Sequence, residues 1–177
     1  MSSVQSSYAA YADSFFSETN RKADRIMNIA VWAYFVFGIF LSLFYETYLI
    51  AFGVGGICLL SYYLTKILLP NHTLHHYVLS VVVGIFCAQY IYQMHGLFEM
   101  HFFFFVGSAL LIIYQNWKLQ LPLLGFIVVH HGTFAYLQYT GMKDIYFTQL
   151  EFMDLSTFLF HAVIASVILF INGMWSF

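Results

Sequence analysis

The chain has 177 residues, of which 62% are hydrophobic, 21% aromatic and only 8% charged, with a formal net charge of −2. A water-soluble domain carries about 25% charged residues, so this composition excludes an ordinary soluble protein and predicts an integral membrane protein. We expect the lipid bilayer as its partner and no nucleic acid. The two cysteines, Cys58 and Cys87, lie inside apolar runs, which gives no indication of a disulfide framework.

The first 26 residues differ in composition from the rest of the chain. They begin with serines and then mix aromatic side chains such as Phe15 and Phe16 with charged ones such as Arg21 and Lys22. They lack the short apolar core of a cleavable signal. We predict a cytoplasmic or interfacial N-terminal helix over 1–26 that runs into the membrane domain; a frayed terminus is the alternative. The transmembrane domain is predicted over 27–177.

Six apolar segments follow, each near the roughly 20 residues that a helix needs to cross a bilayer. They predict an all-α integral membrane protein, a bundle of six transmembrane helices. The segments are Met27–Tyr45, Tyr48–Leu69, Leu74–Gln93, Leu97–Asn116, Leu119–Gln138 and Leu155–Trp175. The longest connection is the loop 140–154, which contains Glu151 and Asp154.

The basic residues predict the orientation of this bundle. With the amino terminus in the cytoplasm, five of the six basic residues lie inside and only Lys143 lies outside, as the positive-inside rule requires. The five are Arg21, Lys22, Arg25, Lys66 and Lys118. An even number of spans then returns the carboxyl terminus to the cytoplasm.

Ionisable residues gather at one depth of the predicted bundle. The rise of about 1.5 Å per residue places them in the outer half of the membrane, on the fourth, fifth and sixth helices. Such groups are costly in lipid and are functional candidates by default. The group consists of Glu99, His101, His130, His131 and His161, with His95, Cys87 and Gln89 as additional or second-shell candidates close to the same slab.

Several imidazoles at one depth favour a bound transition metal or haem iron, because one ion satisfies several buried polar groups at once. Imidazole with one carboxylate suits copper or iron, with zinc as a further alternative. A haem b with His131 and His161 as a facing pair, and a polar or proton network without metal, remain open. Glu99 and His101 are about 200° apart on an ideal helix, so one member of such a pair is expected to orient a ligand, or else two metals are present.

A second histidine group, His72, His75 and His76, begins the third span. The predicted topology places it on the inner side, separated from the outer group by much of a roughly 30 Å hydrocarbon core. The two groups therefore cannot form one site. We interpret His72 and His75 as interfacial residues near the lipid headgroups. His76 is either a structural residue or a further additional or second-shell candidate.

Four motifs give the chain a resemblance to a known module. They are Gly96–Phe102 (GLFEMHF), Tyr114–Lys118 (YQNWK), Val129–His131 (VHH) and Phe160–Ala162 (FHA). In this order they resemble the membrane-integral sensor module found at the amino termini of some bacterial methyl-accepting chemotaxis proteins and diguanylate cyclases. The similar stretch covers Thr73 to Ala162, about half of the chain, and places His76 at a recurring histidine position. Asn116, Lys118 and Gly132 depart from the usual pattern of that module.

The resemblance implies ligand or redox sensing in a bacterial inner (cytoplasmic) membrane, with a homodimer and a cytoplasmic signalling partner. The sequence contains no methyl-accepting, kinase or cyclase domain, which leaves open an isolated module, a piece of a longer protein, or a protein that acts alone or through a partner. The leading expectation is a non-enzymatic sensor that binds copper or iron, in a mononuclear or dinuclear centre. A haem b protein and a metal-dependent membrane oxidoreductase are the alternatives. A transporter is disfavoured because we find no inverted repeat.

Overall fold

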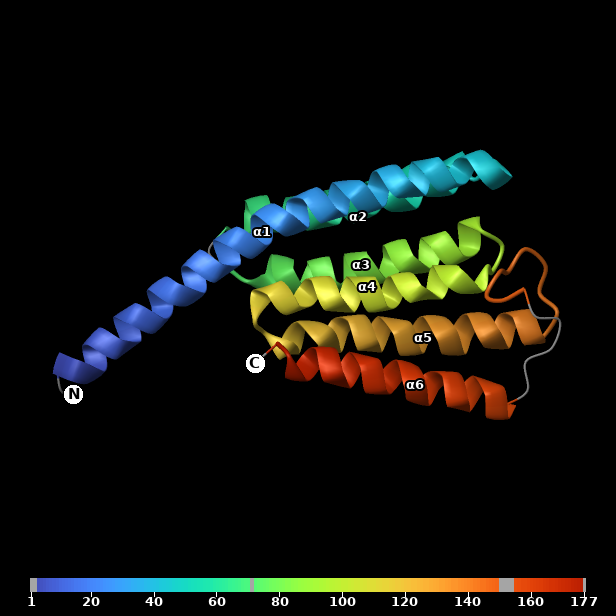
Figure 1. The fold of residues 1–177 in the computed structure, drawn as a ribbon. Coiled ribbons are helices and arrows are strands. Elements are labelled where there is room, and N and C mark those ends of the chain that lie inside the picture. The colour runs from blue at the N-terminus through green and yellow to red at the C-terminus, as the bar shows by residue number, and fades with distance from the viewer. Residues whose placement is uncertain (1–2, 71, 150–154, 177) are drawn as a thin grey trace.

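The computed structural model describes residues 3–70, 72–149 and 155–176, and within them the chain forms helices joined by short loops, with no strand (Figure 1). Glu151 and Asp154 of the predicted long loop lie outside these residues. The α-helices are α1 (Ser3–Tyr45), α2 (Tyr48–Leu68), α3 (Leu74–Gln93), α4 (Phe102–Leu111), α5 (Gln120–Tyr139) and α6 (Leu155–Met174). Three short 3-10 helices, η1 (Phe98–His101), η2 (Ile112–Tyr114) and η3 (Trp117–Leu119), flank α4 and lead into α5.

Four of the described helices are long and apolar enough to cross a membrane. They are α1 from Ser14 onward, α2, α3 and α6 from Ser156 onward. The predicted fourth span is a shorter apolar helix, Phe98–Tyr114, that includes η1, α4 and η2. It begins after Gly96 and stops where Gln115 adopts a left-handed conformation with φ of 49°. The predicted fifth span, α5, carries two glutamines and the His130–His131 pair, which lower its hydropathy.

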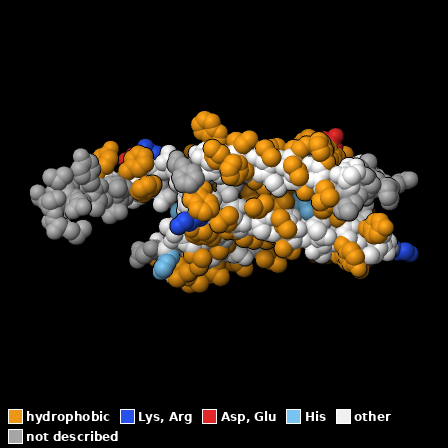
Figure 2. Space-filling view, turned by 90° about the horizontal axis from the view of Figure 1, so that it is seen from below, with side chains coloured by type: hydrophobic (Ala, Val, Ile, Leu, Met, Phe, Trp, Pro, Cys, Tyr) orange, Lys and Arg blue, Asp and Glu red, His pale blue; other side chains and the backbone are white. Residues whose placement is uncertain are grey.

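The surface of the bundle fits an apolar surrounding. Figure 2 shows hydrophobic side chains over the middle of the face in view, with lysine and arginine towards its two ends. Large apolar side chains such as Leu49, Ile67 and Phe170 are more than 60% exposed. On a soluble protein so much exposed apolar surface would drive association. Together with the four apolar helices, this indicates a membrane protein.

Helix α3 is the central element of the bundle. It contacts α1, α2, α4 and α5, and most of its residues are buried, whereas α6 packs against α4 and α5 and buries few. Tyr90 of α3 donates its hydroxyl to the carbonyl of Tyr34 at 2.5 Å and stacks on the Tyr34 ring. Gly107 allows α4 to approach α3 closely, because a Cβ there would collide with Val83. The core therefore fixes α1, α3 and α4 tightly and leaves α6 at the periphery.

The bundle has two distinct ends. The N- and C-terminal labels lie at the same end in Figure 1, which we call the terminal end; α2 finishes and α3 starts there. The opposite, or loop, end carries the turn 94–97 and the loop that follows α5. The predicted interfacial segment and first span form one continuous helix, α1, and its first part projects beyond the other helices at the terminal end.

Candidate functional site

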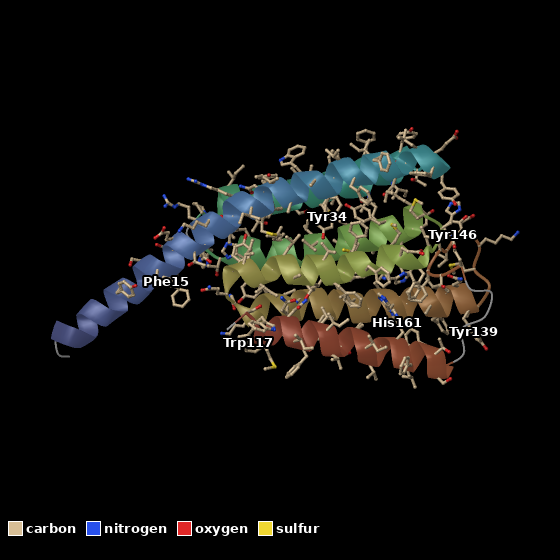
Figure 3. All side chains as sticks on the ribbon, in the orientation of Figure 1. Phe15, Tyr34, Trp117, Tyr139, Tyr146 and His161 are labelled. Carbon is tan, nitrogen blue, oxygen red and sulfur yellow. The ribbon has the colours of Figure 1, made fainter. Side chains whose placement is uncertain are left out.

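Four of the predicted histidines lie together at the loop end. We call His101 of η1, His130 and His131 of α5, and His161 of α6 the loop-end cluster. The ring centroid of His131 is 5.5 Å from that of His101, 5.4 Å from that of His130 and 6.1 Å from that of His161. Figure 3 labels His161 near this end. Three segments separated by up to 60 positions in the sequence thus bring four imidazoles to one place.

The backbone sets the orientation of two of these rings. The Nδ1 atom of His131 lies 3.0 Å from the carbonyl of Ile127, and that of His101 lies 3.2 Å from the carbonyl of Phe98. A carbonyl only accepts hydrogen bonds, so each Nδ1 carries the proton and each Nε2 keeps a free lone pair. This is the tautomer in which a histidine binds a metal through Nε2.

Neutral groups surround the cluster. His101 and His130 are each 5% exposed, and the rings contact Phe98, Phe104 and Phe134. Among the described residues, the polar neighbours of these rings are other histidines and backbone carbonyls. The cluster therefore gathers several good metal donors, with no opposing charge from the described part of the chain.

Phe147 caps the cluster from the loop after α5. Its ring centroid is 5.1 Å from that of His131 and 5.3 Å from that of His101, and its side chain is buried. Gln138 of α5 holds this loop: its Oε1 accepts from the amides of Phe147 and Thr148 at 2.7 and 3.0 Å, and its Nε2 donates to the Thr148 carbonyl at 2.8 Å. The loop therefore shields one side of the imidazoles.

The loop also rests on the turn before η1. Gly96 has a φ of 76°, and a Cβ there would lie 2.7 Å from the backbone of Thr148. A left-handed conformation and so close an approach both favour glycine. The GLFEMHF motif thus packs against the loop through Gly96 and also supplies His101 to the cluster.

The other predicted residues of this end lie outside the cluster. Glu99 is exposed on η1, whereas His101 two residues later is buried, in agreement with their predicted separation around the helix. His95, with φ of 49°, is stacked between Tyr45 at 4.0 Å and Tyr146 at 4.1 Å. Its ring therefore joins Tyr146 of the loop to Tyr45 at the end of α1.

Cys87 and Gln89 belong to the packing of α3. Cys87 is fully buried and lies close to the position where a Cβ on Gly107 would project. The Nε2 of Gln89 donates to Gln93 at 2.9 Å, and Gln93 in turn donates to the Gly38 carbonyl at 2.9 Å. These contacts join α3 to α1.

His76 lies at the terminal end, at the opposite end of α3 from the loop-end cluster. There it belongs to a second group, which we call the terminal-end cluster and which sequence reasoning did not assemble. His76 Nε2 donates to Asp24 Oδ1 at 3.1 Å, Lys66 Nζ lies 2.8 Å from Asp24 Oδ2, and the hydroxyl of Tyr114 donates to Asp24 Oδ1 at 2.8 Å. His75 completes it, with Nε2 at 3.5 Å from Asp24 Oδ2.

The side chain of His75 is packed between helices at the terminal end. It is only 7% exposed and packs beside His76, with ring centroids 4.1 Å apart, while His72 is exposed. Asp24, the centre of this cluster, is 51 residues before His75 and sits in a charged stretch of α1. The HTLHH spacing was visible in the sequence, but nothing in it identified the acidic partner.

The two clusters differ in how closely their donor atoms approach. In the terminal-end cluster, Asp24, His75 and His76 each offer one metal-ligating atom, and these three atoms lie within 4.8 Å of one another. Among the described residues, this is the group of three whose ligating atoms lie so close together. In the loop-end cluster the two Nδ1 atoms of His130 and His131 lie 3.5 Å apart. Side-chain rotation would have to bring further ring nitrogens around one ion.

The chain was also compared with known proteins. No protein-family model, no curated protein and no solved structure matches it. The functional interpretation therefore depends on the geometry of the two clusters and on the chemistry of their side chains.

Proposed function

We propose that this chain is a membrane-embedded sensory module that binds a transition metal ion, copper or iron, through the loop-end cluster. The observation that carries the proposal is the convergence of His101, His130, His131 and His161 from three separate segments into apolar surroundings. Imidazoles buried among phenylalanines lose their hydrogen bonds to water. An ion that binds several of them restores those interactions at once.

The donor set favours a borderline or soft metal. Neutral imidazole nitrogens suit copper, iron, nickel and zinc, whereas magnesium and calcium require oxygen donors. Copper and iron also change oxidation state, so they would allow the module to respond to redox conditions. A centre of two ions is compatible with four histidines and with the exposed carboxylate of Glu99 nearby.

We further propose that the module has six spans with both termini in the cytoplasm of a bacterium. The positive-inside distribution supports this orientation, and so does the placement of both termini at one end of the bundle. The loop-end cluster would then face the periplasm. The four motifs that resemble a sensor module support a role in signalling through a homodimer or a cytoplasmic partner.

Helix α6 is the element best suited to respond to the ion. Near the loop end it contributes His161, and near the terminal end Asn172 donates to Ser108 Oγ of α4 at 3.0 Å. Few of its other residues are buried. An ion that draws His161 towards His101 and His131 would tilt α6 about the Asn172 contact. The state of the metal would thus change the angle at which α6 reaches the terminal end, as a two-state element that the site biases.

Metal analysis of the purified protein tests this function. The full chain is purified in detergent without chelator, and its metal content and optical spectrum are compared for wild type, His131→Ala and a matched control, His72→Ala. We expect near-stoichiometric copper or iron, lost in His131→Ala and retained in His72→Ala, because the side chain of His72 is exposed and belongs to neither cluster. Absence of copper, iron and haem from the wild type would overturn the proposal.

A haem b centre is the second candidate, because the ring centroids of His131 and His161 lie 6.1 Å apart on neighbouring helices. Two histidines that face each other from different helices can serve as the two axial ligands of a haem iron. The same spectra decide between the candidates. A Soret band that disappears in His131→Ala identifies haem, and a bound ion without that band identifies the metal centre.

A further inference from the structure

One buried ring nitrogen of the terminal-end cluster, Nε2 of His75, has no hydrogen-bond partner. His75 Nδ1 lies 2.9 Å from the carbonyl of His72. Since that oxygen can only accept, Nδ1 carries the proton and Nε2 presents a lone pair. This Nε2 is buried and has no hydrogen-bond partner. It faces the carboxylate of Asp24 at 3.5 Å.

A cation between this lone pair and the carboxylate would satisfy both atoms at once. Both atoms are acceptors, and the side chain of His75 is 91% buried, so water reaches the nitrogen poorly. A buried acceptor without a partner loses its hydrogen bonds to water and gains none in return. His76 lies on the other side of the same carboxylate, with Nε2 at 3.1 Å from Oδ1.

We propose that Asp24, His75 and His76 form a second metal site, which takes a divalent transition ion of the zinc class. One oxygen and two nitrogen donors within 4.8 Å of one another form the three-ligand set with which proteins hold zinc while leaving a fourth position open. The backbone carbonyl on His75 Nδ1 is the partner that orients such a ligand. Binding requires His76 to change tautomer: its Nε2 proton is lost to solvent and Nδ1 takes up a proton, so that both imidazoles bind through Nε2 as neutral donors.

The ammonium of Lys66 would compete with a metal ion for the carboxylate of Asp24. This ammonium lies 2.8 Å from Asp24 Oδ2 and also 3.4 Å from the hydroxyl of Tyr62, on a side chain that is 27% exposed. It therefore neutralises Asp24 whenever no metal is bound and must leave the carboxylate when one binds. Its partial exposure gives it a route to solvent. The affinity of the site is accordingly set by the exchange of one cation for another.

The site joins α1, α2, α3 and η2 at the terminal end, because Tyr114 and Lys66 share the same carboxylate. Release of Lys66 by a metal would loosen α2 from α1 at this point while tightening α1 on α3. This location is distinct from the loop-end cluster, so the two sites can be tested independently.

Zinc binding to the full chain in detergent tests the inference, with Zn²⁺ alone as the probe in equilibrium dialysis. Lys66→Met keeps the length of the side chain but removes the charge. We expect it to tighten Zn²⁺ binding by about fivefold, the effect of removing a competing ion pair of ordinary strength. A gain of affinity cannot result from misfolding. His75→Gln and Asp24→Asn are expected to abolish binding at this site.

His72→Ala is the matched control and is expected to leave this Zn²⁺ affinity unchanged, because its side chain belongs to neither cluster. Unchanged affinity in Lys66→Met, or an unreduced number of bound Zn²⁺ ions in His75→Gln, would overturn the inference. Loss of the site in His131→Ala would assign the zinc to the loop-end cluster instead. Absence of any zinc binding to wild type and Lys66→Met would also overturn it, and would leave the copper or iron result for the loop-end cluster unaffected.

Discussion

The two histidine clusters differ in the groups that surround their buried imidazoles. The terminal-end cluster contains an acid, a base and a phenol, and four chain segments meet on the single carboxylate of Asp24. The loop-end cluster gathers four imidazoles, Phe147 and backbone carbonyls, without a charged partner in the described chain. The terminal-end cluster therefore stabilises the fold before any ion binds, whereas the loop-end cluster would gain most of its stability from a bound ion.

The largest effect should come from Asp24→Ala. This change leaves Lys66, His76 and Tyr114 without their shared acceptor, and the loss of a half-buried ion pair together with two hydrogen bonds costs about 3 kcal/mol. We expect such a loss of unfolding free energy in detergent, against about 1 kcal/mol for His131→Ala without metal. Glu18→Ala, which breaks an exposed pair with Lys22, should cause no measurable change. Equal losses for Asp24→Ala and His131→Ala would remove the distinction between the clusters.

A smaller effect is expected from Phe147→Ala, which removes the cap of the loop-end cluster. The lost burial should lower the unfolding free energy by about 2 kcal/mol, less than in a rigid core because the loop can partly collapse. The histidines should also react faster with diethyl pyrocarbonate. Phe102→Ala, at a position that is 49% exposed, serves as the control. Unaltered histidine reactivity in Phe147→Ala would show that the loop does not shield the cluster.

Gly96→Ala should disturb the contact between the same loop and the turn before η1. An L-residue at φ of 76° costs about 1–2 kcal/mol, and its Cβ would meet the backbone of Thr148. We expect the loop to separate from the turn, so that trypsin cleaves faster after Lys143. Gly125→Ala, in a helix with nothing within 4 Å of the added carbon, should leave cleavage unchanged. Equal cleavage rates in the two variants would show that the contact of Gly96 with Thr148 does not hold the loop in place.

The smallest effect is expected from Asn172→Leu, which removes the hydrogen bond between α6 and Ser108. Hydrogen bonds between membrane helices contribute about 0.6 kcal/mol on average, so stability should hardly change. The response to metal should nevertheless change, because α6 loses the contact about which it tilts. A fluorescent probe near the end of α6 would report this movement. An unaltered response in Asn172→Leu, compared with wild type, would exclude this contact as the pivot.

Much of the fold could be predicted from apolar periodicity and length. The predicted ends of α2, α3, α5 and α6 lie within about two residues of the observed ones, because long apolar runs bounded by polar residues leave little freedom. The predicted fourth span is shorter than expected, since Gly96 and Gln115 impose turns that hydropathy does not reveal. Four helices meet the length and composition of a span, and the count of six stays a prediction.

The candidate sites were predictable to different degrees. Counting residues along the fourth, fifth and sixth segments placed His101, His131 and His161 at one depth, and the structure brings their rings together. Depth alone gives no direction around a helix, so Glu99 was grouped with them although it is exposed. Asp24 and Phe147 were missed because a partner 51 residues away and a loop aromatic leave no periodic signal.

The projecting part of α1 has a mechanical consequence. From Ser3 to Asp24 the helix is continuous, and at about 1.5 Å per residue it forms an arm of roughly 30 Å. Asp24 lies at the base of this arm and is tied to Lys66, His76 and Tyr114. A force applied to the tip of the arm is therefore delivered, with leverage, to the one carboxylate on which four segments of the chain converge.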